Sequence, residues 1–374
     1  MENMKVKKVL FAAGGTGGHV FPAIAVADAM RALDDTLDIA FVGAAHGNEA
    51  NWVKKAGYRF ILLDVDFIKG ASFVRKLKNV FSLPGCAKNA MKILRDESPD
   101  LVIGAGGYVS GPIVFMAATH HIRTAIMEQN AIPGLTNRIL SHFVDKIYIS
   151  FQNTTKLPAK KLCYMGNPVR SEKRGDEHAD LAWEESCENG GVSADPNDRL
   201  HLLIFGGSQG AMKLNTDVPK GLAKLPQALR EKIAVYHQAG KGKCEETRKA
   251  YEDVQIHAKT TEFIDDMWAA YRWADLIICR AGATSLAEIK AAGKASILVP
   301  FPFAAHNHQE KNADVMVQMG ASLKVLNDEV AEKIPEILED LFAHRDKLRS
   351  MEASALADAR PNAATAIAED CLNS

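Results

Sequence analysis

Two glycine-rich turns, far apart in the chain, most constrain what it can fold into. In the first, the apolar run 8–13 leads into the glycines of 14–18, and a helical pattern follows. In the second, the apolar run 201–205 leads into 206–210, again before a helical pattern. Glycines there let backbone N–H groups approach an anion, which the positive end of the helix attracts. Two such turns predict two α/β domains that hold a phosphorylated substrate in a cleft.

The composition is that of a folded protein with roughly two domains. The chain has 374 residues, 47% hydrophobic and 24% charged, and its formal net charge of −1 gives no support for a nucleic-acid partner. The six cysteines show no C-x-x-C pairing, which favours reduced thiols in a cytoplasmic protein over a zinc site or disulfide framework. No stretch approaches the ~18 apolar residues of a transmembrane helix, so any work at a membrane takes place at its surface.

Strands and helices alternate in the first half, which predicts a mostly parallel, doubly wound sheet with ligands at the carboxyl ends of its strands. The expected strands are 8–13, 38–43, 60–65, 101–104, 124–127 and 146–150. The expected helices are 22–33, 46–56, 85–97, 111–119 and 136–143. A second alternation has expected strands near 202–205, 234–238, 259–261, 276–279, 296–299 and 321–324, and then a helical tail interrupted at Pro361.

The pattern divides the chain into two Rossmann-like domains. We expect an N-terminal, acceptor-side domain over 1–167 and a C-terminal, nucleotide-binding domain over 200–354. Between them, 168–199 is interpreted as a linker that carries an acidic insertion. A C-terminal helix, 355–374, is expected to rejoin the first domain.

The first glycine turn differs from a dinucleotide-binding fingerprint. Gly15-Thr16-Gly17-Gly18-His19-Val20 lacks the third glycine, and the second strand ends at 41–44 without a carboxylate. Both departures argue against NAD as the ligand of this turn. His19 stands where the helix dipole disfavours protonation, so a neutral imidazole could serve as a base, donate a hydrogen bond, or only brace the turn. A third turn, 104–111, shapes the acceptor side of the cleft or reflects tight packing.

Polar residues follow the strand 124–127. Glu128, Gln129 and Asn130 are placed to bind sugar hydroxyls or an acetamido group, and Glu128 could take a proton from an attacking hydroxyl. Such residues also often only organise a loop. Both interpretations stay open at this point.

The most distinctive stretch is 279–288, where a strand ends at Arg280 and a helix begins near Thr284. Backbone N–H groups of Ala283, Thr284 and Ser285 are expected to receive phosphate oxygens. Glu288 lies one turn on, where an acceptor-only carboxylate suits a ribose diol, although it would also complement the helix dipole. In the following loop, His306 and His308 lack further ligands at metal-site spacing, so no metal is expected.

Eight motifs, in order, resemble the MurG family of bacterial N-acetylglucosaminyltransferases, and the match runs from about residue 8 to 320. They are GGTGGHVFPAIAVA (14–27), GAGGYVSGP (104–112), EQNAIPGLTNR (128–138), GNPVR (166–170), GGSQGA (206–211), TEFIDDM (261–267), CRAGATSLAEI (279–289) and HQEKNA (308–313).

The resemblance implies a GT-B fold, with two domains facing a central cleft, and a reaction that needs no cofactor. It implies inverting transfer of GlcNAc from UDP-GlcNAc to the C4 hydroxyl of the muramyl sugar of lipid I, giving lipid II for peptidoglycan at the cytoplasmic face of the cell membrane. Residues carried over as donor contacts are Thr16, Gly17, Gly18, Asn130, Arg170, Ser208, Ile264, Ala283, Thr284, Ser285, Leu286, Ala287, Glu288 and Gln309. His19 and Glu128 are the candidate catalytic residues.

Two departures from the family pattern are modest. His308 stands where some relatives carry glutamine, and the insertion between 172 and 199 is longer and more acidic than usual. The segment Phe67–Leu83 mixes aromatic residues with four basic ones, which suits an anionic bilayer surface, although a core-facing helix with a basic outer side would look similar.

Three alternatives remain. A UDP-GlcNAc 2-epimerase would share the fold and the nucleotide sugar without the lipid acceptor. A glycosyltransferase could act on another lipid, such as diacylglycerol. A non-catalytic protein could bind the nucleotide sugar without turnover.

Overall fold

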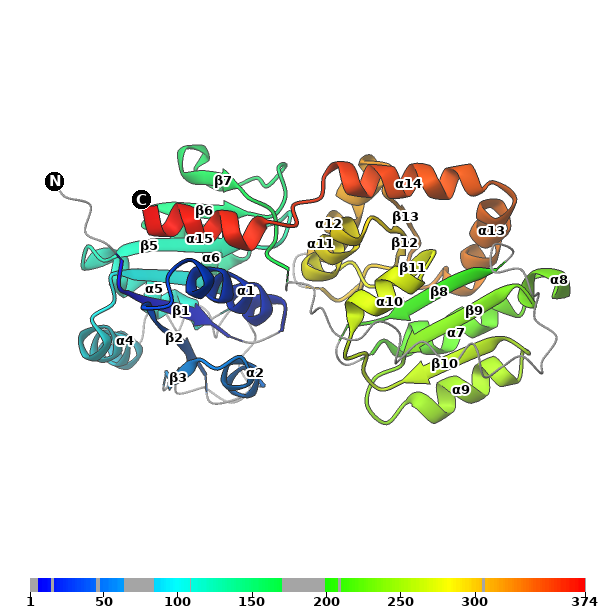
Figure 1. Ribbon diagram of the computed structural model, residues 1–374, viewed down its shortest axis with the longest axis horizontal. Helices are drawn as coiled ribbons and strands as arrows, with labels where there is room; N and C mark the ends of the chain where they lie inside the picture. The colour runs from blue at the N-terminus through cyan, green and yellow to red at the C-terminus, as the bar shows by residue number, and fades with distance from the viewer. Residues whose placement is uncertain are drawn as a thin grey trace. The chain divides into compact units, whose positions relative to one another are not determined.

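Two parallel β-sheets, one from each half of the chain, form the framework of the protein (Figure 1). The structure is a computed structural model, and the residues it describes are 6–14, 17–44, 48–63, 84–107, 109–169, 199–207, 210–304 and 307–373.

The chain forms two compact units. Unit 1 comprises Met1–Ser171 and Arg360–Ser374, and unit 2 comprises Glu172–Ala359. The segment 355–374, expected to be one helix, spans the end of α14 (Arg345–Ala357) and the separate helix α15 (Ala363–Asn373). The residues between these two helices include Pro361, which has no N–H to continue a helical ladder.

The sheet of unit 1 has the strand order β3-β2-β1-β4-β5-β6-β7, and its pairs are parallel. Its strands are β1 (Lys8–Ala13), β2 (Asp38–Gly43), β3 (Arg59–Leu62), β4 (Leu101–Gly106), β5 (Arg123–Glu128), β6 (Lys146–Ile149) and β7 (Leu162–Tyr164). The sequence analysis did not predict β7, an edge strand of only three half-buried residues.

Helices cover both faces of this sheet. They are α1 (Gly17–Leu33), α2 (Glu49–Lys55), α4 (Pro84–Glu97), α5 (Ser110–Thr119), α6 (Leu135–Leu140) and α15, at the red end of the chain in Figure 1. Val9 and Phe11 belong to the core that includes residues of α1 and α15, while Leu10 and Ala12 belong to the core with α4 and α5. This alternation follows from the two-residue period of a strand buried on both faces.

The first helix begins earlier than expected. The prediction started it at Pro22, but α1 begins at Gly17 and contains Pro22 in its second turn. The glycine turn itself therefore supplies the first helical residues, and His19 lies within the first turn of α1.

The sheet of unit 2 repeats the same topology with the order β10-β9-β8-β11-β12-β13. Its strands are β8 (Leu200–Phe205), β9 (Ile233–Gln238), β10 (His257–Thr261), β11 (Leu276–Cys279), β12 (Ala295–Leu298) and β13 (Ser322–Lys324). Its helices are α7 (Met212–Leu222), α8 (Gln227–Arg230), α9 (Cys244–Glu252), α10 (Met267–Trp273), α11 (Ala283–Ala292), α12 (His308–Gln318), α13 (Val330–Ala343) and α14.

The order in unit 2 is the 3-2-1-4-5-6 arrangement of a Rossmann-like domain, and unit 1 has the same order with β7 added beside β6, so the predicted α/β class is confirmed. In such sheets the direction of winding reverses between the first and fourth strands, and ligands bind at the carboxyl end of that point. These points lie between β1 and β4 in unit 1, and between β8 and β11 in unit 2.

Among the helices in the described ranges, none has both the length and the apolar character needed to cross a bilayer.

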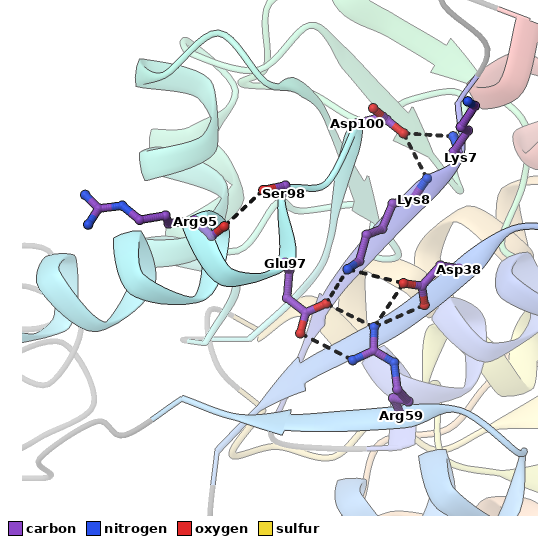
Figure 2. Close-up of polar contacts among 8 residues, drawn as sticks. All are labelled: Lys7, Lys8, Asp38, Arg59, Arg95, Glu97, Ser98 and Asp100. Carbon is purple, nitrogen blue, oxygen red and sulfur yellow. Dashed lines mark hydrogen bonds and ion pairs between the residues drawn. The ribbon is translucent and has the colours of Figure 1, made fainter.

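Charged side chains tie three strands to α4 at the opposite, amino-terminal edge of the first sheet (Figure 2). Glu97 accepts from Lys8 Nζ at 2.8 Å and from Arg59 at 3.0 Å, and both cations also pair with Asp38. Asp100 accepts from the backbone N–H groups of Lys7 and Lys8. The group links β1, β2, β3 and α4 far from the carboxyl ends of the strands.

Glu97→Gln should destabilise unit 1 at neutral pH by about 0.5–1 kcal/mol, a small value because Arg59 is half exposed and solvent screens the pair. The hydrogen bond from Arg59 lowers the pKa of Glu97 to about 2. The carboxylate therefore contributes stability above its unfolded pKa near 4.5, and loses it as the pH falls toward 2. Urea unfolding of both proteins between pH 7 and pH 3 should show the difference shrinking with pH; a constant difference would contradict the assignment.

Candidate active site

Three segments meet at the carboxyl edge of the first sheet. Gly14 follows β1, Gly106 and Gly107 lie at the end of β4, and Glu128 is the last residue of β5. β4 pairs with both β1 and β5, so these residues come from neighbouring strands. The edge includes the switch point between β1 and β4, where the fold places ligands.

Close packing accounts for the glycines of the third turn. Gly106 and Gly107 both have positive φ, at 104° and 80°. A side-chain carbon at Gly106 would lie 2.6 Å from His19 Nδ1, and one at Gly107 would collide with the carbonyl oxygen of Gly14. The turn after β4 therefore supports both the first glycine turn and the imidazole.

His19 is held by a buried glutamine. Gln129 is 2% exposed, its Nε2 donates to the Ala105 carbonyl at 2.9 Å, and its Oε1 lies 3.2 Å from His19 Nδ1. Because the amide nitrogen of Gln129 donates to a carbonyl, the amide oxygen faces the imidazole ring. This oxygen can only accept, so it accepts from the Nδ1–H group of His19. This tautomer places the imidazole lone pair on Nε2, as a general base requires.

Glu128 has the contacts of a residue that organises a loop. It is 2% exposed; Oε1 accepts from the Asn130 backbone N–H at 2.9 Å, and Oε2 from the Gly134 N–H at 3.0 Å and Asn137 Nδ2 at 2.8 Å. Burial raises the pKa of Glu128, and the hydrogen bonds from these donors lower it. The effect of burial is larger, so the pKa stays above its usual value. Of the two roles left open by the sequence, the geometry favours the structural one, which positions Asn130.

The turn before α11 provides donors in unit 2. Its N-cap is Gly282, which has no side chain to accept from the first N–H groups of the helix. The predicted phosphate-binding residues Ala283, Thr284 and Ser285 are the first residues of α11, next to the switch point between β8 and β11. The amide groups of a first helical turn have no acceptor within the helix, so this terminus suits an anion.

Glu288 lies one turn further along α11, where it is half-buried. Its Oε2 accepts from the hydroxyl of Tyr271, on α10, at 2.8 Å. Leu286 is fully buried in the domain, whereas Ala287 is half-buried beside Glu288.

Gln238 is a residue that the sequence analysis did not single out. It ends β9 and is 3% exposed, Nε2 donates to the Gly207 carbonyl at 2.8 Å, and Oε1 accepts from the Ile264 backbone N–H at 3.2 Å. It joins the second glycine turn to the predicted nucleotide contact at Ile264. The only signal in the sequence was its position at the end of an apolar strand.

Arg280 and Gln309 shape the loop after β12. Nη1 of Arg280 donates to the carbonyls of Val299 and Pro300 at 3.0 and 3.2 Å, and burial lowers the pKa of its guanidinium. Gln309 Oε1 accepts from the Phe301 N–H at 2.9 Å. Both side chains thus hold the loop between β12 and α12 in place.

Some expected site residues lie outside the described part of the chain. Gly17 and Gly18 begin α1, but Thr16, Arg170 and Ser208 are not among the described residues, nor is the segment Phe67–Leu83. Within the described ranges, His, Cys, Asp and Glu form no group of three or more that could hold a metal ion.

Comparison with known proteins agrees with a nucleotide-sugar enzyme of two Rossmann-like domains. Residues 9–149 match the glycosyltransferase family 28 N-terminal domain, and residues 201–367 match the glycosyltransferase family 28 C-terminal domain. The fold and the paired glycine turns thus define a family 28 glycosyltransferase with the GT-B fold.

Full-length relatives narrow this class. The chain is 42% identical over 367 residues to the UDP-N-acetylglucosamine–N-acetylmuramyl-(pentapeptide) pyrophosphoryl-undecaprenol N-acetylglucosamine transferase of Syntrophus aciditrophicus, covering 98% of both chains. It is 40% identical to the enzyme of that name from Myxococcus xanthus, covering 98% of this chain and 92% of the other. The crystal structure of Acinetobacter baumannii MurG superimposes with a TM-score of 0.76 at 31% identity, covering 98% of this chain and all of that one. The chain belongs to the MurG family.

A UDP-GlcNAc 2-epimerase from Neisseria meningitidis also superimposes, with a TM-score of 0.66 at 13% identity and coverage of 98% and 100%. At that identity the similarity shows a shared fold only.

Gly107→Ala should destabilise unit 1, by about 1–3 kcal/mol from the positive φ alone and further because the new carbon meets the Gly14 carbonyl. Gly85→Ala is the matched control, since a side-chain carbon there has no atom within 4 Å. Chemical unfolding of both variants should separate them clearly. Equal stability would show that the two turns do not depend on this close approach.

Proposed function

We propose that the protein transfers GlcNAc from UDP-GlcNAc to the C4 hydroxyl of the muramyl sugar of undecaprenyl-pyrophosphoryl-MurNAc-pentapeptide, giving lipid II with inversion at the anomeric carbon. Relatives that carry the name of this enzyme match the chain over nearly its whole length. The observation that carries the proposal is the turn before α11, which combines uncapped N–H groups with Glu288 at the switch point of unit 2.

The donor is bound mainly by unit 2 in this proposal. The N–H groups of 283–285 receive the diphosphate, Glu288 accepts from the ribose hydroxyls, and Ile264 contacts the base. Since Gln238 takes the Ile264 N–H, the carbonyl of Ile264 is the group we assign to the uracil. Gln309, Arg170, Ser208, Asn130 and the turn formed by Thr16, Gly17 and Gly18 complete the proposed set.

Charge grows on the diphosphate as the acceptor hydroxyl attacks the anomeric carbon. Preorganised backbone N–H groups and a helix dipole stabilise that charge where it develops. We assign the general base to His19 Nε2, because the bond from Nδ1–H to Gln129 holds the ring in the required tautomer. Glu128 then acts through the loop that carries Asn130.

The acceptor is anchored in a membrane, so we also propose a peripheral association with the cytoplasmic face. Its basis is the sequence of Phe67–Leu83, where Lys69, Arg75, Lys76 and Lys78 alternate with aromatic and aliphatic residues. Such a segment binds anionic lipid through both charge and apolar area.

Incubation of the purified protein with UDP-GlcNAc and lipid I tests the reaction. The proposal expects the disaccharide lipid and one UDP released per transfer. Formation of UDP-ManNAc without acceptor would identify an epimerase instead. Transfer to diacylglycerol alone would identify another acceptor, and binding without turnover would exclude an enzyme.

Glu288→Ala should weaken UDP-GlcNAc binding by about 10–100-fold, since hydrogen bonds to a charged group are worth roughly 1.5–3 kcal/mol. Glu339→Ala, an exposed glutamate on α13, is the control and should leave affinity unchanged. Calorimetry measures both, with circular dichroism to check folding. Unaltered affinity in Glu288→Ala would refute the ribose assignment.

His19→Ala should lower kcat by about 10²–10⁴-fold, the usual contribution of a general base. The KM for UDP-GlcNAc should change much less. His344→Ala, an exposed histidine between α13 and α14, should have neither effect. Steady-state transfer assays with saturating lipid I give both constants. A normal kcat would remove His19 from the catalytic assignment.

A further inference from the structure

Tyr271 makes a contact with the proposed ribose-binding carboxylate that no motif accounts for. It lies on α10, is completely buried, and its hydroxyl donates to Glu288 Oε2 at 2.8 Å. The direction of the bond is fixed, because an ionised carboxylate only accepts. Tyr271 therefore holds one oxygen of Glu288 in place.

The ring of Tyr271 is itself immobilised. Phe205, the last residue of β8, and Trp268 both pack against this ring in edge-to-face geometry. The distance between ring centroids is 6.2 Å for Phe205 and 6.0 Å for Trp268, and the angles between the ring planes are 64° and 80°. A ring held on two sides keeps its hydroxyl in one place. Because Phe205 directly precedes the second glycine turn, the same ring connects that turn to α11.

The phenol of Tyr271 is protonated, and therefore a donor, at neutral pH. Burial, and then the charge of Glu288, raise the pKa of Tyr271 well above its usual value. Burial and the same carboxylate also raise the pKa of the Cys279 thiol, at the end of β11, so Glu288 meets neutral groups on this side. The neutral hydroxyl of Tyr271 thus anchors the Glu288 carboxylate without neutralising its charge.

We propose that Tyr271 is a positioning residue for donor recognition: its hydroxyl fixes the rotation of the Glu288 carboxylate so that it accepts from both hydroxyls of the nucleotide ribose. A carboxylate accepts about four hydrogen bonds, so the bond from Tyr271 sets its orientation and leaves capacity for a diol. The advantage is entropic, since a glutamate fixed before binding loses less freedom when the donor arrives. This inference rests on the proposed function of Glu288.

The main test uses Tyr271→Phe, which deletes one oxygen and keeps the ring that packs on Phe205 and Trp268. The probes are UDP and 2′,3′-dideoxy-UDP, which lacks both ribose hydroxyls, with affinities measured by calorimetry. We expect the variant to bind UDP about tenfold more weakly than the wild-type protein and to bind the dideoxy nucleotide within twofold. In transfer assays, KM for UDP-GlcNAc should rise by a similar factor and kcat should stay within threefold.

Tyr58→Phe is the matched control. Tyr58 is also buried, and its hydroxyl donates to a carboxylate oxygen of Asp28 at 2.6 Å, but the pair lies in unit 1. Deleting this hydroxyl should change the affinity for either nucleotide by less than twofold. A tenfold loss in both tyrosine variants would indicate a general effect of the deletion and overturn the proposal.

Glu288→Ala provides a second measurement that does not depend on ribose analogues. If Tyr271 acts through Glu288, adding Tyr271→Phe to Glu288→Ala should leave UDP affinity unchanged. Two results would overturn the inference even if the wild-type protein binds UDP. One is a further tenfold loss of UDP affinity in the double variant. The other is an equal loss of affinity for UDP and for the dideoxy nucleotide in Tyr271→Phe. Failure of the wild-type protein to bind UDP would instead reject the proposed function, and the inference with it.

Discussion

Close approach of backbone to backbone, at the carboxyl ends of the parallel strands, is the constraint on which the rest of the structure depends. In unit 1 the turn after β4 packs Gly107 against the Gly14 carbonyl, and in unit 2 Gly210 packs against the carbonyl of Ala239. Any side chain there would push the turns apart. The N–H groups of the helix N-termini that follow these turns would then no longer point toward a common site, and they would bind an anion less well.

Both units reinforce these turns with a buried amide. Gln129, just after β5, donates to the carbonyl of Ala105, and Gln238, at the end of β9, donates to the carbonyl of Gly207. In each case the amide oxygen faces a second group, His19 Nδ1 in one unit and the Ile264 N–H in the other. A buried amide with both ends satisfied is rigid, so each glutamine transmits the position of a glycine turn to a residue expected to meet substrate.

The fold alone does not distinguish a glycosyltransferase from an epimerase, because a UDP-GlcNAc 2-epimerase of 13% identity has the same architecture. In the proposed mechanism, the distinction depends on side chains at the carboxyl edges of the sheets. His19 in a defined tautomer and Glu288 beside Tyr271 give each unit a polar group of fixed orientation. Full-length relatives at about 40% identity place the chain in the MurG family.

Sequence alone determined the two α/β domains and most strands, because buried parallel strands are continuous apolar runs and glycine turns mark where they end. It missed the start of α1 at Gly17, where a proline inside the second turn concealed the boundary, and the short edge strand β7. Only the tertiary structure showed that Glu128 accepts hydrogen bonds from the loop that follows it, and that Gln129, Gln238 and Tyr271 contact residues distant in sequence. These roles arise from contacts between strands and helices distant in sequence, and local pattern carries no record of such contacts.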